Sequence, residues 1–525
     1  MGTKGTKENH FEEHIVDYLT QEVQEYHQLD RGSYDKKLLL IPGELVQFVI
    51  DTQPKKYRKL QEQYGNRADE VIAEAVSRHI NQQKTLKVLR GEVRVGGEKI
   101  KMLYFKPSTN KTPEHEEWYR KNRMAVIRQL NYSTKNNNSI DLVFFVNGIP
   151  VVTVELKNVL TGQNHHNAIK QYVQDRDPKG EAFLEFQRCL VHFAAGTEKI
   201  FMTTHLKGKS TFFLPFNKSL DNSNPDGFAT SYLWEDVLRK DSLLDLLQNY
   251  INLQIDKEKV YDPKLGGLKE IESKKLIFPR WHQRRAVQSL IDQLRKDGTG
   301  KNYLVQHSAG SGKSNTITWL AYKLANFYQN PTDRRSMYDS VFVVTDRKVL
   351  NTQLQKNIRQ LDKTSGMIAY LGDNSSSQDL KNAIEDRKKI IITTIQKFRI
   401  ISDLVQNYKD RNYAILIDEA HSSQSGEVAR HMRKALSLEQ AAKEEGDNSD
   451  IDDIITAEIM RKGQQPNISQ FAFTATPKDK TVQLFGTEID GEKKAFDTYS
   501  MEQAIKEGFI RDVLENYMSF KRYYK

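Results

Sequence analysis

The chain has 525 residues and 38% hydrophobic content, enough for about three domains with packed cores. Its 79 Lys and Arg against 69 Asp and Glu give a net charge of +10, which favours a polyanionic partner, although an ordinary surface can carry such an excess. The single cysteine, Cys189, excludes an internal disulfide framework and fits a reducing cytoplasm. The polar start and the lack of an apolar run of about 20 residues predict neither a signal peptide nor a membrane span.

Helical and extended patterns alternate in the N-terminal region. Apolar residues at helical spacing predict helices, and the stretches concerned are Asn9–Leu19, Pro42–Ile50, Ala68–Ile80 and Glu117–Leu130. The stretch Leu86–Phe105 instead alternates in polarity around Gly96-Gly97, which is typical of a hairpin. We therefore expect a mixed α/β region at the start of the chain.

Two further apolar runs give the strongest hairpin signal. The runs Ile140–Val146 and Ile149–Leu156 have strand composition and are joined by Asn147-Gly148, a pair that favours the tight turns of hairpins. Positions 141 and 155 are nearly equidistant from this turn (147 − 141 = 6, 155 − 148 = 7). The hairpin is therefore predicted to bring these two positions close together.

Three charged residues stand at the ends of this hairpin. Asp141 opens the first strand, while Glu155 and Lys157 close the second strand and share a face because they are two residues apart. Two carboxylates can share Mg²⁺, which activates a bound water and neutralises a scissile phosphate, while Lys157 orients or activates the nucleophile. The alternative is a solvent-facing pair of hairpin ends, but a carboxylate that ends the apolar run VVTVELK is costly without a cation.

A change of composition separates this region from the rest of the chain. The segment Gly227–Ile251 has leucines at helical spacing and predicts a pair of helices. The stretch Asp256–Lys274 that follows is polar, charged and turn-rich, as domain boundaries are.

The second region contains a predicted phosphate-binding loop. The apolar run Tyr303–Val305 leads through small residues into a helical pattern, in the order strand, loop, helix. Glycines let the backbone turn its N–H groups inward, a lysine reaches the β- and γ-phosphates, and the next serine can ligate Mg²⁺. His307 stands where the pattern GxxxxGK[ST] has its first glycine, so the strict pattern is broken there. The candidate nucleotide-binding residues are Gly310, Ser311, Gly312, Lys313 and Ser314.

An acidic pair lies 105 residues after Lys313 (418 − 313). The run Ala414–Ile417 predicts a buried parallel strand that ends in Asp418 and Glu419. Carboxylates in this position can hold Mg²⁺ and polarise the attacking water. The alternative, a solvated turn after a strand, is disfavoured by the phosphate loop that precedes it.

These motifs resemble those of superfamily 2 helicases and translocases. The resemblance implies that Gln283 reads adenine, with Trp281 or His282 nearby for stacking. Three later stretches look like motifs Ia, Ib and III and follow in the expected order. They contain Thr345, Asp346 and Arg347; Thr393, Thr394 and Gln396; and Thr474, Ala475 and Thr476. Four of these residues are weaker candidates for contacts to DNA: Thr345, Arg347, Thr394 and Gln396.

The hairpin resembles the core of PD-(D/E)xK nucleases. Asp141 corresponds to the first acid, and Glu155 and Lys157 to the ExK element. Ile140 replaces the proline of the pattern, and Glu12 matches the helical acid that often precedes the core. The resemblance implies a metal-dependent nuclease site built from Asp141 and Glu155.

Two other candidate site features near this core have weaker support from the sequence. Gln171 matches the glutamine of a QxxxY element, but Asp175 stands where the tyrosine is expected. His165 and His166 are a candidate metal pair, but adjacent side chains diverge on a helix or strand, so a surface position explains them better.

A nuclease core followed by such a motor resembles the restriction (R, or motor) subunit of type I restriction-modification enzymes. The resemblance implies an α/β chain with a restriction-endonuclease-like mixed-sheet domain and joining helices over residues 1–255, then a RecA-like parallel-sheet ATPase domain over 256–490. Residues 491–525 would begin the connection to a second RecA-like domain, which this sequence lacks, so we expect part of a longer motor. Ser437–Ile454 is acidic and predicted to be a mobile loop.

The same resemblance implies ATP-dependent translocation on, and cleavage of, double-stranded DNA, with Mg²⁺ as the metal. Its expected partners are a methyltransferase (M) subunit and a specificity (S) subunit, with no membrane involved. A stand-alone helicase-nuclease for DNA repair or phage defence is the alternative. A structural DNA-binding module without catalysis is a more distant one.

Overall fold

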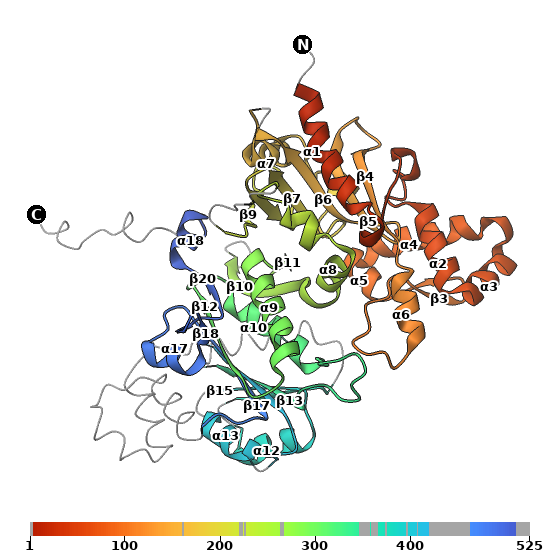
Figure 1. Cartoon of the computed structure of the whole chain (residues 1–525). Coiled ribbons are helices and arrows are strands. Elements are labelled where there is room, and N and C mark those ends of the chain that lie inside the picture. The colour runs from red at the N-terminus through yellow and green to blue at the C-terminus, as the bar shows by residue number, and fades with distance from the viewer. Residues whose placement is uncertain are drawn as a thin grey trace, which may run out of the picture. The chain divides into compact units, whose positions relative to one another are not determined.

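The computed structural model describes residues 4–159, 162–219, 224, 227–262, 267–345, 358, 366–372, 375–394, 397–406, 408–418 and 463–510. It divides into two compact units, Met1–Arg280 and Trp281–Lys525 (Figure 1). The first unit is a mixed α/β structure, and the second contains a parallel sheet. This order of a mixed sheet followed by a parallel sheet is the fold class that the sequence predicts.

The first unit is built on a seven-stranded sheet with the strand order β1-β4-β5-β6-β7-β8-β9. The pairs β1–β4 and β6–β7 are parallel, and the other neighbouring strands are antiparallel. The mixed sheet confirms the predicted type. Its strands are β1 (Tyr26–Gln28), β4 (Met124–Asn131), β5 (Ser139–Val146), β6 (Ile149–Lys157), β7 (Val191–Gly196), β8 (Ile200–Thr203) and β9 (Leu214–Pro215).

Several helices of this unit begin where the sequence provides a start signal. Pro42, Pro54 and Pro113 occupy the first turns of α2, α3 and α6, where the missing proline N–H costs no hydrogen bond. Helices α1 and α7 pack against β6, the strand that carries Glu155. The helices are α1 (Lys4–Leu19), α2 (Pro42–Thr52), α3 (Pro54–Tyr64), α4 (Ala68–Gln83), α5 (Thr85–Arg90), α6 (Pro113–Arg120), α7 (His165–Gln174) and α8 (Lys240–Asp245).

The turn between β5 and β6 confirms the predicted hairpin. Asn147 and Gly148 have φ values of 51° and 78°, the left-handed region in which glycine is favoured. A Cβ atom on Gly148 would lie 2.4 Å from the carbonyl oxygen of Ile41 and 2.9 Å from the nitrogen of Leu45. Glycine is therefore required here both by the backbone conformation and by the close approach of α2.

One prediction in this region was wrong, and another was confirmed over a shorter stretch. The expected helix over Glu117–Leu130 ends at Arg120 as α6, and β4 starts at Met124. The first four residues of β4 are all buried, so the strand shows no alternation that would distinguish it from a helix. The expected hairpin around Gly96-Gly97 is confirmed as the antiparallel pair β2 (Glu92–Val95) and β3 (Glu98–Lys101). It is shorter than the predicted stretch because the preceding residues form the short helix α5.

The segment that joins the two sheets contains more structure than the sequence predicts. The expected helix pair forms as two π-helical turns, η6 (Leu233–Val237) and η7 (Leu246–Tyr250), with α8 between them. The polar stretch around the predicted boundary forms a long antiparallel ribbon of β10 (Asn252–Asp262) and β11 (Gly267–Ile277). Most of β11 is exposed, which explains its polar composition.

The second unit is built on a seven-stranded sheet with the order β14-β15-β13-β16-β17-β12-β20. Each pairing between neighbouring strands is parallel. The carboxyl ends of the described strands therefore lie along one edge of the sheet. The strands are β12 (Asn302–His307), β13 (Ser340–Thr345), β14 (Ile368–Leu371), β15 (Ile390–Thr394), β16 (Tyr413–Asp418), β17 (Ile468–Thr474) and β20 (Asp497–Tyr499). A separate small hairpin consists of β18 (Thr487–Ile489) and β19 (Glu492–Lys494).

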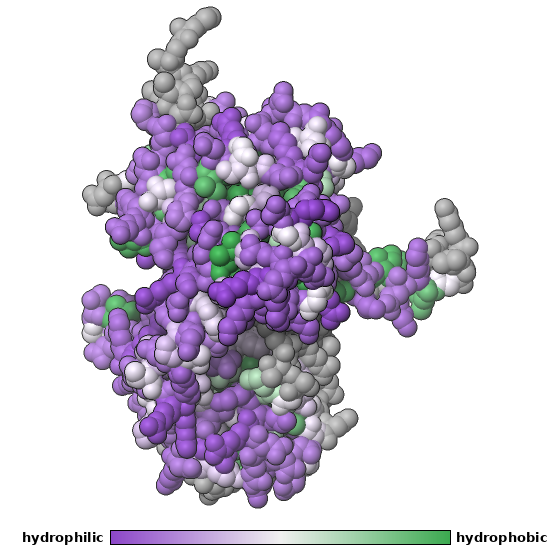
Figure 2. All heavy atoms as spheres, turned by 90° about the vertical axis from the view of Figure 1, so that its right-hand side faces the viewer, coloured by the Kyte–Doolittle hydropathy of each residue, from purple (hydrophilic) through white to green (hydrophobic). Residues whose placement is uncertain are grey.

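Apolar side chains from the strands and helices form the core of this unit. Buried residues such as Phe342, Ile391 and Ile417 pack with Leu380 and Ile401 from the helices. The helices are α9 (Trp281–Asp297), α10 (Lys313–Ala325), α12 (Ser377–Glu385), α13 (Phe398–Gln406), α17 (Asp479–Phe485) and α18 (Met501–Lys506). Among the described residues of the whole chain, no helix has the length and apolar character to cross a bilayer. The face of the molecule in Figure 2 is mostly hydrophilic, with small hydrophobic areas.

Candidate functional site

Asp141 and Glu155 lie on the paired strands β5 and β6. The ladder includes Leu142 opposite Val154, so the next positions along the strands, 141 and 155, face each other. Asp141 Oδ2 accepts a hydrogen bond of 2.7 Å from the backbone N–H of Leu156, and both carboxylates are buried. The predicted approach of the two acids is therefore present in the structure.

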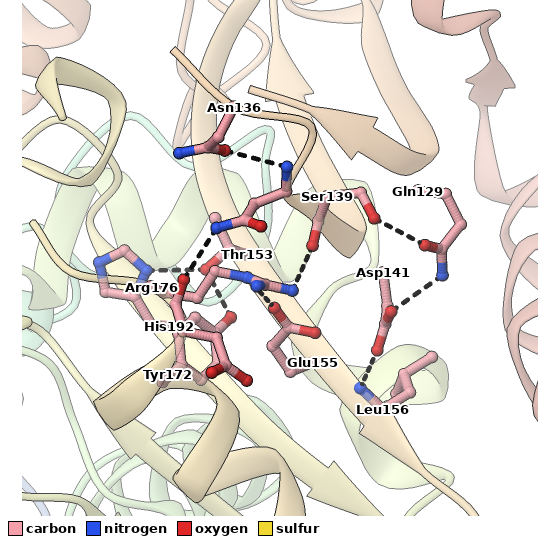
Figure 3. Close-up of polar contacts among 12 residues, drawn as sticks. Gln129, Asn136, Ser139, Asp141, Thr153, Glu155, Leu156, Tyr172, Arg176 and His192 are labelled. Carbon is pink, nitrogen blue, oxygen red and sulfur yellow. Dashed lines mark hydrogen bonds and ion pairs between the residues drawn. The ribbon is translucent and has the colours of Figure 1, made fainter. Parts of the chain in front are cut away.

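Glu155 is held by an arginine that the sequence analysis did not identify. Its Oε1 atom forms an ion pair of 2.8 Å with Nε of Arg176, which also donates a hydrogen bond to the Ser139 carbonyl (Figure 3). The other oxygen, Oε2, is buried, has no hydrogen-bond partner among the described residues and points toward Asp141 (Figure 3). Burial, and then the charge of Asp141, raise the pKa of Glu155 well above its usual value, although Arg176 opposes this. Two carboxylates in this arrangement need a proton or a cation between them.

Gln129 connects Asp141 to a third carboxylate. Its side-chain amide donates to Glu12 Oε1 over 2.6 Å and to Asp141 Oδ1 over 2.9 Å, while its oxygen accepts a hydrogen bond from the Ser139 hydroxyl. Gln129 has a φ of 49°, uncommon for a residue other than glycine, and interrupts the ladder between β4 and β5. Burial and then the charge of Asp141 raise the pKa of Glu12 to about 7, and the amide of Gln129 partly offsets them. Because Glu12 lies on α1, the two hydrogen bonds of the Gln129 amide connect the carboxylate pair to that helix.

Lys157 and Gln171 lie near the carboxylate pair. Lys157 is the last residue of β6, it is half-buried, and its charge lowers the pKa of Glu155. Gln171 is half-buried on α7, and within the described residues its side chain makes no hydrogen bond to either acid. The next residue, Tyr172, is buried, and its hydroxyl lies 2.7 Å from the Thr153 hydroxyl. The catalytic roles of Lys157 and Gln171 therefore stay predictions.

The structure gives no support for a histidine metal site. The rings of His165 and His166 have centroids 4.1 Å apart, and His165 also stacks on Phe201. Burial and then the neighbouring His166 lower the pKa of His165 to about 4. Across the part of the chain that the structure describes, no group of three or more His, Cys, Asp or Glu side chains could hold a metal by itself. A cation at Asp141 and Glu155 would therefore have two protein carboxylates and would need further ligands.

The second candidate site is the loop between β12 and α10, as the sequence predicts. Gly310 and Gly312 have φ values of 74° and 86°, so the loop uses a conformation that favours glycine at both positions. Lys313 begins α10 and is buried, and its Nζ atom donates to the carbonyls of His307 at 3.3 Å and Ser308 at 3.5 Å. The ammonium group of Lys313 thus lies among the loop carbonyls, at the place where the phosphate groups of a nucleotide would bind.

Side chains from α9 contact this loop. Nε2 of Gln283 donates to the carbonyls of Ser311 and Gly312 over 3.2 and 3.1 Å, and His282 lies 3.1 Å from the same Ser311 carbonyl. A Cβ atom on Gly312 would lie 2.4 Å from Gln283 Nε2, so the loop and α9 are closely packed. The role of Gln283 toward adenine stays a prediction, and His282 stacks on Tyr499.

Several other predicted residues lie at the carboxyl ends of the parallel strands. Asp418 ends β16 and is buried, while Thr345 and Thr394 end β13 and β15. Ser314 lies in the first turn of α10. Because carboxyl ends of parallel strands share one edge, these groups lie along the edge that carries the loop after β12. Some predictions fall outside the described residues: Glu419, Asp346, Arg347, Gln396 and the insertion Ser437–Ile454.

Comparisons with known proteins match both units. Residues 42–211 match the family described as the type I restriction enzyme R protein N terminus, and residues 282–442 match the SWI2/SNF2 ATPase family. A relative in Methanocaldococcus jannaschii, assigned as a type I restriction enzyme endonuclease subunit, is 23% identical, and the alignment covers 86% of this chain and 41% of that protein. The HindI endonuclease subunit of Haemophilus influenzae is 26% identical over 86% of this chain and 40% of that protein.

A solved fragment ascribed to an HsdR subunit from Vibrio vulnificus aligns with 73% of this chain and 56% of that chain, at 14% identity. Its TM-score of 0.27 is too low to establish a shared fold. The chain spans about two fifths of the length of the curated relatives it matches. The R-protein family matches the unit with the carboxylate pair, and an ATPase family matches the unit with the phosphate loop. Over 86% of its length, the chain is therefore similar to the endonuclease subunits of type I restriction enzymes.

Proposed function

We propose that this chain provides the nuclease and the first motor domain of an enzyme that translocates on double-stranded DNA with ATP and cuts it. The observation that carries the nuclease part is the buried pair of Asp141 and Glu155, in which Oε2 of Glu155 has no hydrogen-bond partner among the described residues. The partners we propose are an M subunit and an S subunit, because the matched relatives are subunits of type I restriction enzymes.

Mg²⁺ fits the residues at this pair. Oε2 of Glu155 is a buried acceptor aimed at a second carboxylate, and hard divalent cations prefer such oxygen ligands. Asp141 and Glu155 would hold the ion, which would activate water and neutralise the scissile phosphate. Arg176 fixes one oxygen of Glu155 and leaves the other for the ion, while Gln129 and the Leu156 N–H orient Asp141.

Lys157 supplies a positive charge at the end of the strand that carries Glu155. In this proposal it orients the attacking water and stabilises the negative charge that develops on the phosphate. Gln171, on the neighbouring helix α7, is a weaker candidate for contact with the substrate.

In the second unit, the residues around the loop fit a nucleotide with a Mg²⁺ ion. The hydroxyls of Ser308, Ser311 and Thr316 are buried and have no hydrogen-bond partners among the described residues. Lys313 would bind the β- and γ-phosphates, and the N–H groups of the loop would surround them. Ser314 and Asp418 would hold the ion, Glu419 would orient the water, and Gln283 would read the base.

The test of this proposal separates the two units. In the complete enzyme assembled with M and S subunits, Asp141→Asn and Glu155→Gln should each abolish cleavage of unmethylated DNA with a recognition site. ATP hydrolysis should stay close to wild type, because the phosphate loop belongs to the other unit. Glu70→Gln, an exposed carboxylate on α4, is the matched control and should cut normally. Continued cutting by the Asp141→Asn enzyme would remove that residue from the site.

Cleavage should also depend on the motor. Lys313→Ala should abolish ATP hydrolysis and cutting together, because the nuclease would receive no translocated DNA. Incubation of the wild-type complex with DNA and Mg²⁺ but without ATP should give intact DNA. Cutting in the absence of ATP would contradict this dependence while leaving the nuclease assignment in place.

A further inference from the structure

His307, which breaks the glycine pattern of the phosphate loop, is part of a buried hydrogen-bond network. Its side chain is fully buried at the end of β12 and its Nε2 atom lies 2.8 Å from Oδ1 of Asp497. Asp497 is the first residue of β20, the strand that borders β12 at the edge of the sheet. The side chain that replaces glycine therefore connects the start of the loop to the neighbouring strand.

Asp497 is in turn held by α9. Nε and Nη2 of Arg285 donate to its two carboxylate oxygens over 2.8 and 2.9 Å, which is a bidentate pair. Burial alone would raise the pKa of Asp497, but the hydrogen bonds from His307 and Arg285 hold it below its usual value. Burial lowers the pKa of His307, so the imidazole is neutral and donates its Nε2–H to the charged Asp497.

The loop is thus held at both ends by the first turns of α9. At its start, Arg285 acts through Asp497 and His307, and at its end Gln283 donates to the carbonyls of Ser311 and Gly312. The main chain adds a hydrogen bond of 3.0 Å from the Ser308 N–H to the Tyr499 carbonyl. Among the described contacts, Asp497 reaches the loop through His307, while Arg285 also donates to the Thr498 carbonyl of β20 over 2.9 Å.

Movement at His307 would move the lysine of the site. The carbonyls of His307 and Ser308 are the acceptors for Lys313 Nζ, so their position sets where the ammonium group lies. We propose that His307, Asp497 and Arg285 are positioning residues that fix the start of the phosphate loop for binding nucleotide phosphates. This inference rests on the proposed nucleotide binding. It adds Asp497 and Arg285, which lie outside the GxxxxGK[ST] pattern, and gives a role to His307, which replaces the first glycine of that pattern.

The test measures nucleotide affinity by equilibrium fluorescence with labelled ADP. His307→Leu removes the donor and Asp497→Asn removes the charge that anchors it, so each should weaken binding about tenfold or more, the usual cost of losing a hydrogen bond to a charged group. His307→Gln keeps an N–H donor near the same place and should recover most of the affinity. Asp292→Asn, an exposed change on the same helix, should bind as wild type does.

If His307, Asp497 and Arg285 only stabilised the fold, the variants would give different results. It would lower the melting temperature of the nucleotide-free protein and leave the affinity of the folded fraction unchanged, so both quantities are measured for each variant. Wild type must bind ADP and Lys313→Ala must bind it poorly; if wild type fails, the nucleotide proposal itself is wrong. If these two behave as expected while Asp497→Asn binds like wild type, the positioning role is wrong. If His307→Leu does not fold, Asp497→Asn and His307→Gln decide the question.

Discussion

Arg176 gives the sharpest prediction, because it is the only described side chain that forms an ion pair with Glu155. Both members are almost fully buried, with 6% and 0% of their side chains exposed. Arg176→Met keeps much of the aliphatic volume and leaves a buried carboxylate beside Asp141 without its cation. Breaking a buried pair on one side costs about 3–5 kcal/mol of unfolding free energy. With a denaturant slope of roughly 3 kcal/mol per M, the urea midpoint of the first unit should fall by roughly 1–2 M.

The double variant Glu155→Gln/Arg176→Met should recover most of this loss, because the neutral amide has no charge to compensate and can donate to Asp141. The loss in the single variant should also be smaller at lower pH, where a proton can neutralise Glu155. The direction of this pH dependence follows from the raised pKa of Glu155, because burial favours the protonated, neutral form of its side chain. Cys189, the single buried cysteine of the chain, reports on the first unit alone if its labelling by a thiol-reactive dye is followed in urea.

Arg67→Met is the matched control, because Arg67 forms an exposed pair with Glu70 at a similar distance. Its urea midpoint should equal that of wild type. Equal midpoints for Arg176→Met and wild type would refute the reasoning, because Glu155 could then not be a buried charge held by Arg176. Failure of the double variant to recover would show that Arg176 acts through contacts other than Glu155.

Three further outcomes are expected in the first unit. Gly148→Ala should cost more than about 3 kcal/mol because its Cβ would meet the Ile41 carbonyl at 2.4 Å, whereas Gly97→Ala, with nothing within 4 Å, should change thermal unfolding little. Burial raises the pKa of Cys189 to about 12, so alkylation of the folded protein at pH 8 should be slower than that of the urea-unfolded chain by a factor of a hundred or more; equal rates would contradict the burial. Chelation by EDTA should stop DNA cleavage without lowering the melting temperature in calorimetry, since protein donors already hold both acids; a fall of several degrees would show that the fold needs the ion.

The parts of the fold that the sequence predicted best depend on short-range backbone chemistry. Asn147-Gly148 specifies a turn through the φ angles that these two residues tolerate, and this turn brings β5 and β6 together as a hairpin. A register shift between Phe144 and Phe145 then moves the pairing by one residue, so that Asp141 faces Glu155. The phosphate loop is likewise specified by glycines between an apolar strand and a helix. The sequence alone could therefore place Asp141 near Glu155, whereas the register shift that sets them directly opposite each other is seen only in the structure.

The residues that hold these acids could not be predicted in the same way. Gln129 lies in a strand whose buried residues do not alternate, so the sequence of this stretch predicts a helix. Arg176 follows α7 and reaches Glu155 only because that helix packs on β6, and the contact of His307 with Asp497 spans 190 positions (497 − 307). No local pattern records such contacts, since they arise from the packing of distant segments.

The place of β12 in its sheet also determines when the nucleotide site can form during synthesis. Both neighbours of β12 are encoded late, since β17 starts at Ile468 and β20 ends at Tyr499, 192 positions after His307 (499 − 307). At about 5–20 residues per second, a ribosome needs roughly 10–40 s to supply the last partner. Until β17 is synthesised both edges of the apolar strand β12 lack their native pairing, and one edge lacks it until β20 follows. Such edges are templates for association with other chains. The phosphate loop is therefore a late product of translation, and a nascent chain arrested before residue 468 should bind chaperones and no nucleotide.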